Sequence, residues 1–463
     1  MAGQFITIHV GQCGNSIGME FWKNLCEEHG ISKDGSLLQP DSCKDVKDAF
    51  FYQADDDRYI PRSVLVDLEP RVINGILSSD YGKLYNQENI FLGPEGSGAG
   101  NAWTRGYRSG KEFEEEIFSI LDREAENADY LEGFILTHSI SGGTGSGLGS
   151  FLTEHINEKY PKKLLHTYSV FSEEKDSNVV VAPYNSILTL RHLIEHPDLV
   201  SIVDNTALFR LSQDRMRRSA PELGHSLGQS ANYELQNKLI SKVMTSSCGT
   251  FRFPGPTYGT MASIISQLNP FPPLHFIQSA YTPLTSPSSD FIQKTSVQDI
   301  LQRLVHPSSM MVSTRPDPAK KHCLLSGLAI LQGDFTFSDL SNAMDRLERR
   351  KAFRYPTWSP LPLEVTSCPR SPNIKHHSRV SGLLLANHTN ISTLFERVLE
   401  NFNMLRKKKA FLFQNDDYFP DILSFMDESK TRVEEICEEY LQATTPDFVP
   451  ISNFTFESDE KNA

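Results

Sequence analysis

One stretch of the chain constrains its fold more than any other, because it joins an apolar run to a glycine-rich turn and then to a helical pattern. Residues 133–138 are apolar enough for a buried strand. Four of the six residues at 142–147 are glycine, and apolar residues recur at helical spacing over 148–156. This order is typical of an open α/β sheet, which binds its ligand beyond the carboxyl ends of its strands.

The same alternation of apolar runs and helical patterns continues through the first half of the chain. The expected strands are residues 5–10, 64–68, 133–138, 164–171 and 200–204. An amphipathic helix is expected at 15–29, where Gly30 offers a C-cap. The segments between the strands are long enough for crossover helices. We therefore expect an α/β fold with a doubly wound parallel sheet.

The rest of the chain divides by composition. Residues 216–232 are rich in Gly, Ser and Arg and are expected to form an extended loop, whereas helical spacing over 233–244 predicts a connecting helix. Many prolines and short apolar runs at 274–277 and 324–331 predict a smaller α/β intermediate domain. Two amphipathic patterns after residue 390 predict C-terminal helices. The expected units are 1–222, 223–249, 250–380, 381–450 and a polar tail at 451–463.

Charge and cysteine content exclude several functional classes. The chain has 45 Lys and Arg against 58 Asp and Glu, and a net charge of -13 argues against nucleic acid as a partner. Its 7 cysteines are odd in number and include no C-x-x-C pair, which argues against a disulfide framework and favours a reducing compartment. The sequence shows no signal peptide and no apolar run long enough to cross a membrane.

The glycine turn has the composition of a phosphate cradle. Glycines let backbone N–H groups approach an anion, and the start of the next helix adds unpaired N–H donors and the positive end of a dipole. The turn fits neither the Walker A pattern nor G-x-G-x-x-G, and the alternative is a flexible turn without a ligand. The candidate residues are Ser139, Gly142, Gly143, Thr144, Gly145, Ser146, Gly147 and Leu148.

Other loops are expected to converge on the same ligand. Gln12 and Cys13 follow the first expected strand. Asp67 and Glu69 follow the second and face the same side if the chain is extended. Two carboxylates beside phosphates imply Mg²⁺ or ordered water between them, and the alternative is a solvated helix entry. Further amides for a terminal phosphate are offered by Ala99, Gly100 and Asn101.

A base-binding surface is predicted in the connecting helix. Tyr233 and Asn237 lie one helical turn apart and therefore share a face. The tyrosine offers a plane for stacking, and the asparagine offers an amide that suits guanine. Asn205, which ends an expected strand, is a third candidate. The alternative is a core tyrosine and a surface amide.

One pattern points to a different chemistry. Residues 14–18 match G-x-S-x-G around Ser16, between a strand and a helix. A nucleophile elbow needs an earlier strand–helix connection to supply an oxyanion N–H, and only one strand precedes this one, so a serine hydrolase is disfavoured and no catalytic residue is assigned. The histidines show neither H-E-x-x-H nor H-x-x-E-H spacing, so histidine-based metal catalysis is not expected.

Together these loops resemble the nucleotide loops of the tubulin family. The matching motifs, in the expected order, are GQCGN at 11–15, VDLEP at 66–70, GAGN at 98–101, GGTGSG at 142–147 and VDNTAL at 203–208. Stretches such as YPKKLLHTYSVF and RVSGLLLANHT are most similar to gamma-tubulins. The resemblance covers almost the whole chain.

The resemblance implies a protein that binds GTP or GDP with Mg²⁺ and is at most a slow GTPase. The residues that would lie near the phosphates are 12–13, 99–101, 139 and 142–148. The pair at 67 and 69 would lie near Mg²⁺, and residues 205, 233 and 237 would hold guanine. The family role would be to template alpha/beta-tubulin assembly and cap minus ends at a microtubule organising centre, such as a centrosome or spindle pole body. Gamma-tubulin complex proteins and lateral self-association in a ring are the implied partners, in the cytoplasm and cytoskeleton. The alternative is a self-polymerising tubulin-like GTPase.

Two segments depart from the tubulin pattern. Asn178 and Ala182 stand where tubulins usually offer acidic or amide groups to the ribose. Residues 254–263 resemble the loop that touches the next subunit's nucleotide, but they contain no Asp or Glu, and Ser263 stands where alpha-tubulin has its acid. We therefore expect slow hydrolysis of bound GTP unless an alpha-tubulin supplies the missing acid.

Overall fold

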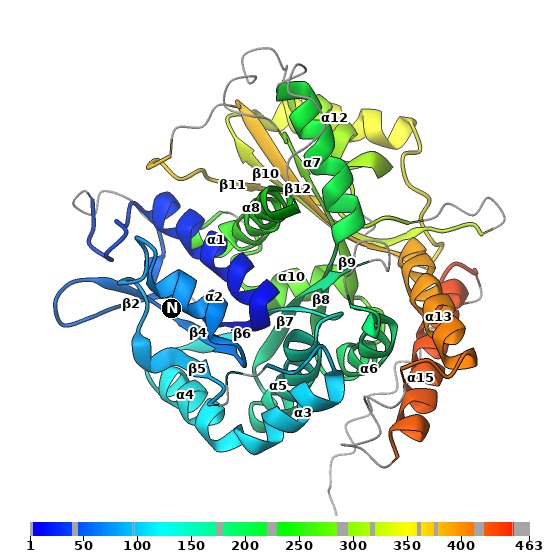
Figure 1. Ribbon diagram of the computed structural model, residues 1–463. Coiled ribbons are helices and arrows are strands. Elements are labelled where there is room, and N and C mark those ends of the chain that lie inside the picture. The colour runs from blue at the N-terminus through cyan, green and yellow to red at the C-terminus, as the bar shows by residue number, and fades with distance from the viewer. Residues whose placement is uncertain are drawn as a thin grey trace, which may run out of the picture.

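A twisted sheet runs through the computed structural model (Figure 1). Within the described residues it has 10 strands, in the order β11-β10-β12-β9-β8-β7-β6-β1-β4-β5. The strands are β1 Gln4–Val10, β4 Ser63–Asp67, β5 Ile90–Leu92, β6 Leu131–Ser139, β7 Leu164–Phe171, β8 Leu199–Asp204, β9 Phe276–Thr282, β10 Leu324–Gly333, β11 Glu364–Cys368 and β12 Val380–His388. The structure describes residues 3–38, 45–94, 96, 98–172, 179–219, 229–255, 257–284, 295–314, 320–358, 363–374, 378–411, 421–446 and 448.

Every neighbouring pair of strands from β5 to β9 is parallel. The chain runs from β1 to β4 and β5 on one side and then returns to β6 on the other side of β1, so that Ile8 pairs with both Val64 and Leu136. The strand order therefore reverses at β1, which confirms the predicted doubly wound sheet. Such a reversal opens a crevice beyond the carboxyl ends of the strands.

Helices cover both faces of this parallel part, which explains why almost every residue of its strands is buried. Along β1 the side chains alternate, so that Ile6 and Ile8 pack toward one set of helices and Phe5 toward the other. The first set is α3 Trp103–Glu112, α4 Glu114–Glu126, α5 Gly149–Lys159 and α6 Ala182–Glu195. The second is α1 Gly11–His29, α2 Pro70–Leu77, α7 Asn205–Ser219, α8 Gln229–Ser247, α9 Gly249–Arg252 and α10 Met261–Leu268.

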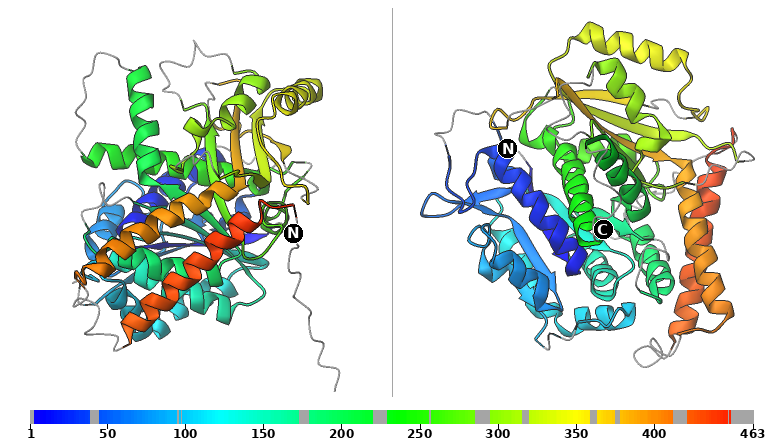
Figure 2. Two further views of the ribbon diagram at one scale, coloured as in Figure 1. Left: turned by 90° about the vertical axis from the view of Figure 1, so that its right-hand side faces the viewer. Right: turned by 45° about the horizontal axis from the view of Figure 1, so that its top comes forward.

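The second half of the chain extends the same sheet. Strand β12 is antiparallel to both β9 and β10, and β11 is parallel to β10. The helices α11 Val297–Leu304 and α12 Phe337–Arg349 cover these strands. The helices α13 Ser392–Lys407 and α15 Ile422–Gln442 lie side by side and pack on α6 (Figure 2). Smaller elements are the hairpin of β2 Phe51–Gln53 with β3 Tyr59–Pro61 and the 3₁₀ turns Lys47–Ala49, Gln87–Asn89, Pro307–Ser309 and Thr389–Ile391.

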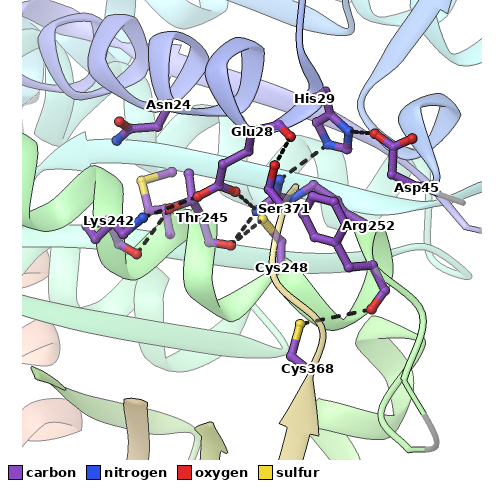
Figure 3. Close-up of polar contacts among 12 residues, drawn as sticks. Asn24, Glu28, His29, Asp45, Lys242, Thr245, Cys248, Arg252, Cys368 and Ser371 are labelled. Atoms are coloured by element: carbon purple, nitrogen blue, oxygen red, sulfur yellow. Dashed lines mark hydrogen bonds and ion pairs between the residues drawn. The ribbon is translucent and has the colours of Figure 1, made fainter. Parts of the chain in front are cut away.

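A buried polar network joins α1, α8 and the segment after β11 (Figure 3). Arg252 Nη2 donates to Glu28 Oε2 at 2.6 Å and to the Thr245 carbonyl at 2.6 Å. The Ser371 hydroxyl donates to the backbone carbonyl of Glu28. Burial alone would raise the pKa of Glu28, but Arg252 and Lys242 hold it below its usual range, so the carboxyl is ionised. The network therefore fixes α1 to α8 and to the second half of the sheet.

The structure differs from the sequence-based prediction in several elements. The connection between α7 and α8 is shorter than the loop predicted at 216–232, because α7 continues to Ser219 and α8 begins at Gln229. Residues 220–228 lie outside the described part. The strand predicted at 274–277 lies at Phe276–Thr282, where it pairs with β8 and β12. Strands β2, β3, β5, β11 and β12 were not predicted, and the predicted tail at 451–463 lies outside the described residues.

Candidate functional site

A cavity of about 750 Å³ lies at the carboxyl ends of the strands, beside the point where the strand order reverses. Its lining includes Val10 at the end of β1, Asp67 at the end of β4, Ser139 at the end of β6 and Asn205 directly after β8. Helices α1 and α7 begin immediately after their strands and α2 shortly after its own, so several helix N-termini lie at this edge. The volume is within the usual range for a small-molecule site.

Most of the predicted nucleotide-site residues line this cavity. They are Gln12, Cys13, Asp67, Glu69, Ala99, Asn101, Ser139, Gly142, Gly143, Thr144, Gly145, Asn205, Tyr233 and Asn237. Four predicted residues do not line it: Gly100, Ser146, Gly147 and Leu148. The fold therefore brings together loops that are widely separated in the sequence.

Two of these four residues, Ser146 and Leu148, support the glycine turn on the side away from the cavity. The turn continues into a π-helical turn, Thr144–Leu148, ahead of α5. The Ser146 hydroxyl donates to the carbonyl oxygens of Gly142 and Gly143, and Leu148 belongs to the apolar core. A π turn of this kind is frequent at functional sites. Here it points these two side chains away from the cavity.

The other two are glycines with conformational roles. A Cβ on Gly147 would lie 2.1 Å from the Trp103 carbonyl oxygen, so only glycine lets α3 pack this closely on the turn. Gly100 is exposed and has a φ of +54°. This left-handed conformation favours glycine and makes the bend between Ala99 and Asn101, both of which line the cavity.

A buried histidine of β6 fixes the glycine turn. His138 Nδ1 lies 2.8 Å from the Gly145 carbonyl oxygen, and Nε2 lies 2.8 Å from the Ser169 hydroxyl. Burial lowers the pKa of His138 to about 4, so the ring is neutral. Because a carbonyl only accepts, Nδ1 carries the proton and the serine donates to Nε2. His138 is not among the residues predicted from the sequence.

Asn185, in the first turn of α6, joins two of the cavity loops. Its Nδ2 donates to the Asn101 carbonyl at 2.8 Å and to the Ser141 carbonyl at 2.9 Å, and its Oδ1 accepts from the Trp103 N–H at 3.0 Å. Asn185 is also absent from the residues predicted from the sequence. The sequence signal that could have indicated it was an amide within a predominantly apolar helix. In the structure, Asn185 is completely buried.

The first loop lies against the glycine turn. Gly11 has a φ of +71° and takes the chain directly from β1 into α1, so the helix begins earlier than predicted. A Cβ on Gly11 would lie 3.1 Å from the Gly145 nitrogen. Asn15 Nδ2 donates to the Gly11 carbonyl at 3.0 Å and to the Val66 carbonyl at 3.1 Å, which fixes this loop to β4.

The position of Ser16 does not support a hydrolase. Its hydroxyl lies within α1 and donates to the Gln12 carbonyl at 2.8 Å. No histidine is among the described residues that line the cavity, so the serine has no imidazole there to act as its base.

Asp67 has the environment of a cation-binding carboxylate. It is 2% exposed, its Oδ1 accepts from the Glu69 N–H at 3.2 Å, and its Oδ2 has no hydrogen-bond partner in the described part of the chain. Burial, with a smaller contribution from the Glu69 charge, raises the pKa of Asp67 to about 6. An unpartnered buried oxygen beside a second carboxylate fits a divalent cation.

The remaining charges of the cavity are also acidic. Glu20 and Glu234 line it together with the pair at 67 and 69, and no Lys or Arg does so among the described residues. A polyanionic ligand in this cavity would therefore depend on backbone N–H groups and on a cation.

The far end of the cavity is formed by α8. Tyr233 is 45% exposed, so it is not the core tyrosine of the alternative interpretation, and Asn237 is half-buried. Gln236 also lines the cavity, and its Oε1 is buried without a hydrogen-bond partner in the described residues. Of the two ribose departures, Ala182 is buried at the start of α6 and does not line the cavity. Asn178 lies outside the described residues.

The predicted subunit-contact segment at 254–263 lies at the opposite edge of the sheet. It leads into α10, where the Thr260 hydroxyl accepts from the Ser263 N–H at 3.2 Å. β6 runs between the two edges, from Leu131 near α10 to Ser139 at the cavity. At about 3.3 Å per residue, this strand separates them by roughly 26 Å.

A carboxylate does reach this segment, but from another element. Glu132, at the start of β6, accepts through Oε1 from the Met261 N–H at 2.6 Å and from the Ala262 N–H at 3.2 Å. Burial raises its pKa, which the two backbone hydrogen bonds oppose. The segment itself contains no Asp or Glu, but Glu132 of β6 places a carboxylate beside it.

Two family models match the chain. The model of the Tubulin/FtsZ family GTPase domain matches residues 4–213, which contain every cavity loop that precedes α8. The model of the tubulin C-terminal domain matches residues 272–400, from β9 into α13. A GTPase domain implies a guanine nucleotide as the ligand. Among the described helices, none combines the length and apolar character that crossing a bilayer requires. The motifs, the fold and both matched domains agree, and the chain belongs to the tubulin family.

Proposed function

We propose that this tubulin-family protein is a gamma-tubulin-like template that nucleates alpha/beta-tubulin assembly and caps microtubule minus ends. In this proposal it binds GTP or GDP with Mg²⁺ and is at most a slow GTPase. It acts at a microtubule organising centre, in a ring held by gamma-tubulin complex proteins. The proposal extends the guanine-nucleotide binding that the GTPase domain implies.

The cavity supports the assignment of nucleotide contacts. The backbone of the turn at 142–145 and of the loops at 11–13 and 99–101 would hold the phosphates, because no described residue of the lining has a basic side chain. Asp67 and Glu69 would hold Mg²⁺ directly or through water, which offsets the acidic lining. Tyr233 would stack on the base, and Asn237 with Asn205 would contact its edge.

The observation that carries the nucleating role is the absence of an acid in the segment at 254–263. This segment and the nucleotide cavity lie at opposite edges of the sheet, which suits head-to-tail stacking of one subunit on the next. A subunit whose own segment lacks the acid is poorly suited to trigger hydrolysis in a copy of itself. It can still present its nucleotide to an alpha-tubulin, which carries the acid.

A self-polymerising tubulin-like GTPase is the second candidate, and Glu132 favours it. Its carboxylate lies at the N-terminus of α10 and could serve where the residue at 263 does not. Against this role, Oε1 of Glu132 is already committed to two backbone N–H groups.

Nucleotide binding to the purified full chain is the first test. We expect GTP and GDP to bind more tightly than ATP, with affinity that depends on Mg²⁺. Tyr233→Ala and Asn237→Ala should weaken GTP binding, and Asn237→Ala should also reduce the preference for guanine. Equal affinity for ATP and GTP would contradict the assigned site.

Assembly assays separate the two candidate roles. For a nucleator, substoichiometric protein should shorten the lag of alpha/beta-tubulin assembly and block growth at minus ends, while the chain alone with GTP forms no sedimenting polymer. Polymer formed by the chain alone, with no effect on the tubulin lag, would favour the self-polymerising candidate.

A further inference from the structure

Three side chains of the kinds that ligate metals lie close together on the face of the sheet covered by α3 to α6. Glu154 comes from α5, His192 from the last turn of α6, and His196 directly follows that helix. One ligand atom from each lies within 4.8 Å of the other two. None of the three lines the nucleotide cavity, so this cluster is separate from the site described above.

His192 is the unusual member of the cluster. It is 5% exposed, yet neither ring nitrogen makes a hydrogen bond within the described part of the chain. Its Nδ1 lies 3.5 Å from Glu154 Oε2, which is longer than a normal hydrogen bond. Buried polar groups almost always have partners, so this imidazole needs an explanation.

Packing alone does not explain it. The ring lies against Trp103 and Phe425, with centroid separations of 5.7 and 6.3 Å, where an apolar side chain would fit without burying two nitrogens. Beside it, the Tyr107 hydroxyl donates to Glu154 Oε2 at 2.7 Å. The carboxylate is therefore held in place next to an imidazole that has free lone-pair capacity.

We propose that Glu154, His192 and His196 bind a divalent transition-metal ion of the Zn²⁺ class, with a fourth position open to water. Two imidazoles and one carboxylate are a common donor set for Zn²⁺, and histidines four residues apart share a helix face. Tetrahedral bonds of about 2.0 Å place ligand atoms about 3.3 Å apart, so small side-chain adjustments would close the site. Mg²⁺ prefers oxygen ligands and would not compete well here.

The neighbouring cation does not oppose this proposal. Arg191 lies 3.4 Å from the Glu195 carboxylate and 3.3 Å from that of Glu428, and it stacks on Phe425 at 4.4 Å. Its charge is therefore matched by two carboxylates outside the cluster. A bound ion would link α5 to α6, the helix that carries Asn185 at its other end. The proposal does not depend on the function proposed above.

The test is metal binding by the full-length chain without an affinity tag, stripped of metals and then saturated with Mg²⁺ and GDP. Zn²⁺ affinity is measured by competition with a chromogenic chelator, and Co²⁺ serves as a spectroscopic probe. We expect a single Zn²⁺ per chain and a tetrahedral Co²⁺ spectrum without a thiolate charge-transfer band. His196→Gln and Glu154→Gln should each weaken Zn²⁺ binding by at least about 100-fold.

His155→Gln is the matched control, because His155 is adjacent to Glu154 on α5 and its Nδ1 lies 3.0 Å from the Phe151 carbonyl oxygen instead. This variant should bind Zn²⁺ as the unmodified chain does. His192→Leu should remain folded without metal, because it removes two unpaired nitrogens, yet it should lose the Co²⁺ spectrum. Zn²⁺ binding that His196→Gln leaves unchanged, or no Zn²⁺ binding by the unmodified chain, would overturn the proposal.

Discussion

Asp67 is a buried carboxyl whose ionised form the folded chain disfavours in the absence of a cation. Its pKa rises from the usual 3.8 to about 6, mainly through burial. The folded state therefore holds this proton more tightly than the unfolded state, so ionisation lowers the free energy of unfolding as the pH rises between about 4 and 6. The full loss above that window is up to roughly 3 kcal/mol.

We expect Asp67→Asn to stabilise the nucleotide-free chain in EDTA at about pH 8 and to have little effect near pH 4. Urea denaturation at both pH values measures the difference, and Glu115→Gln, at an exposed residue outside the cavity, is the control. With Mg²⁺ and GTP present, the same Asp67 substitution should weaken nucleotide binding. A stability difference that does not change with pH would show that the buried carboxyl is not the cause.

Asn185 is expected to matter through the loops that it joins. Asn185→Ala removes three hydrogen bonds and leaves buried backbone groups unpaired, at a cost of about 3 kcal/mol, and it should also weaken GTP binding. Thr189→Val, one turn along α6, removes one hydrogen bond to the Asn185 carbonyl and should cost about 1 kcal/mol without changing GTP affinity. Denaturation and nucleotide titration of both variants distinguish these effects. Equal GTP affinity for all three proteins would contradict the role of Asn185.

Cavity residues that directly follow predicted strands could be predicted from the sequence, and residues that act through contacts with distant segments could not. The turn at 142–145 and the pair at 67 and 69 follow strands, so their common position could be inferred from the strand ends. His138 and Asn185 act through contacts to other segments, which no local spacing encodes. Glu132 could not be predicted either, because it contacts α10 from a strand that is distant in sequence.

At the scale of elements, the glycine turn contains glycines that close packing requires and glycines that line the cavity. Gly147→Ala places a Cβ 2.1 Å from the Trp103 carbonyl oxygen and 2.6 Å from the Tyr107 nitrogen, and we expect a loss of about 3 kcal/mol or more, or no folding. A Cβ on Gly142 meets nothing within 4 Å, so Gly142→Ala should fold normally and impair only nucleotide binding. Thermal unfolding and GTP titration check both. A normally stable Gly147→Ala variant would refute the packing argument.

The network around Arg252 gives a second prediction at this scale. Arg252→Met leaves the Glu28 carboxylate without its main partner and should cost about 3–5 kcal/mol. Adding Glu28→Gln should recover part of that loss, because it removes the unpaired charge. The penalty of Arg252→Met should also shrink toward low pH, where Glu28 becomes protonated. Urea denaturation at two pH values measures this, and a double variant less stable than Arg252→Met would contradict it.

Long elements with strong periodicity were predicted well, and short or context-dependent ones were not. β7 matches its predicted bounds, and both C-terminal helices are present. The strands β2, β3 and β5 have three residues each, too few to show a pattern. β12 is buried along almost its whole length because it lies between β9 and β10, and its apolar run at 383–386 does not by itself distinguish a strand from a buried helix.

At the scale of the molecule, one continuous sheet carries the nucleotide cavity at one edge and α10 at the other. Two surfaces on opposite edges form a heterologous pair, which generates open head-to-tail assemblies when the partner offers a complementary edge. For a nucleator, the partner on the nucleotide edge is an alpha-tubulin that brings the missing acid. The rate of GTP hydrolysis should therefore depend on which protein binds at the nucleotide edge.

We expect the purified chain, loaded with γ-labelled GTP, to release phosphate slowly alone and faster when alpha/beta-tubulin with unlabelled GTP is added. Raising the chain's own concentration should have little effect, since Ser263 supplies no carboxylate and Oε1 of Glu132 is bound to α10. Glu132→Gln should leave the tubulin-stimulated rate unchanged. Turnover that rises with the chain's own concentration and falls in Glu132→Gln would instead make Glu132 the substitute acid of a self-polymerising GTPase. Equal turnover with and without tubulin would remove the basis for the proposed division of roles.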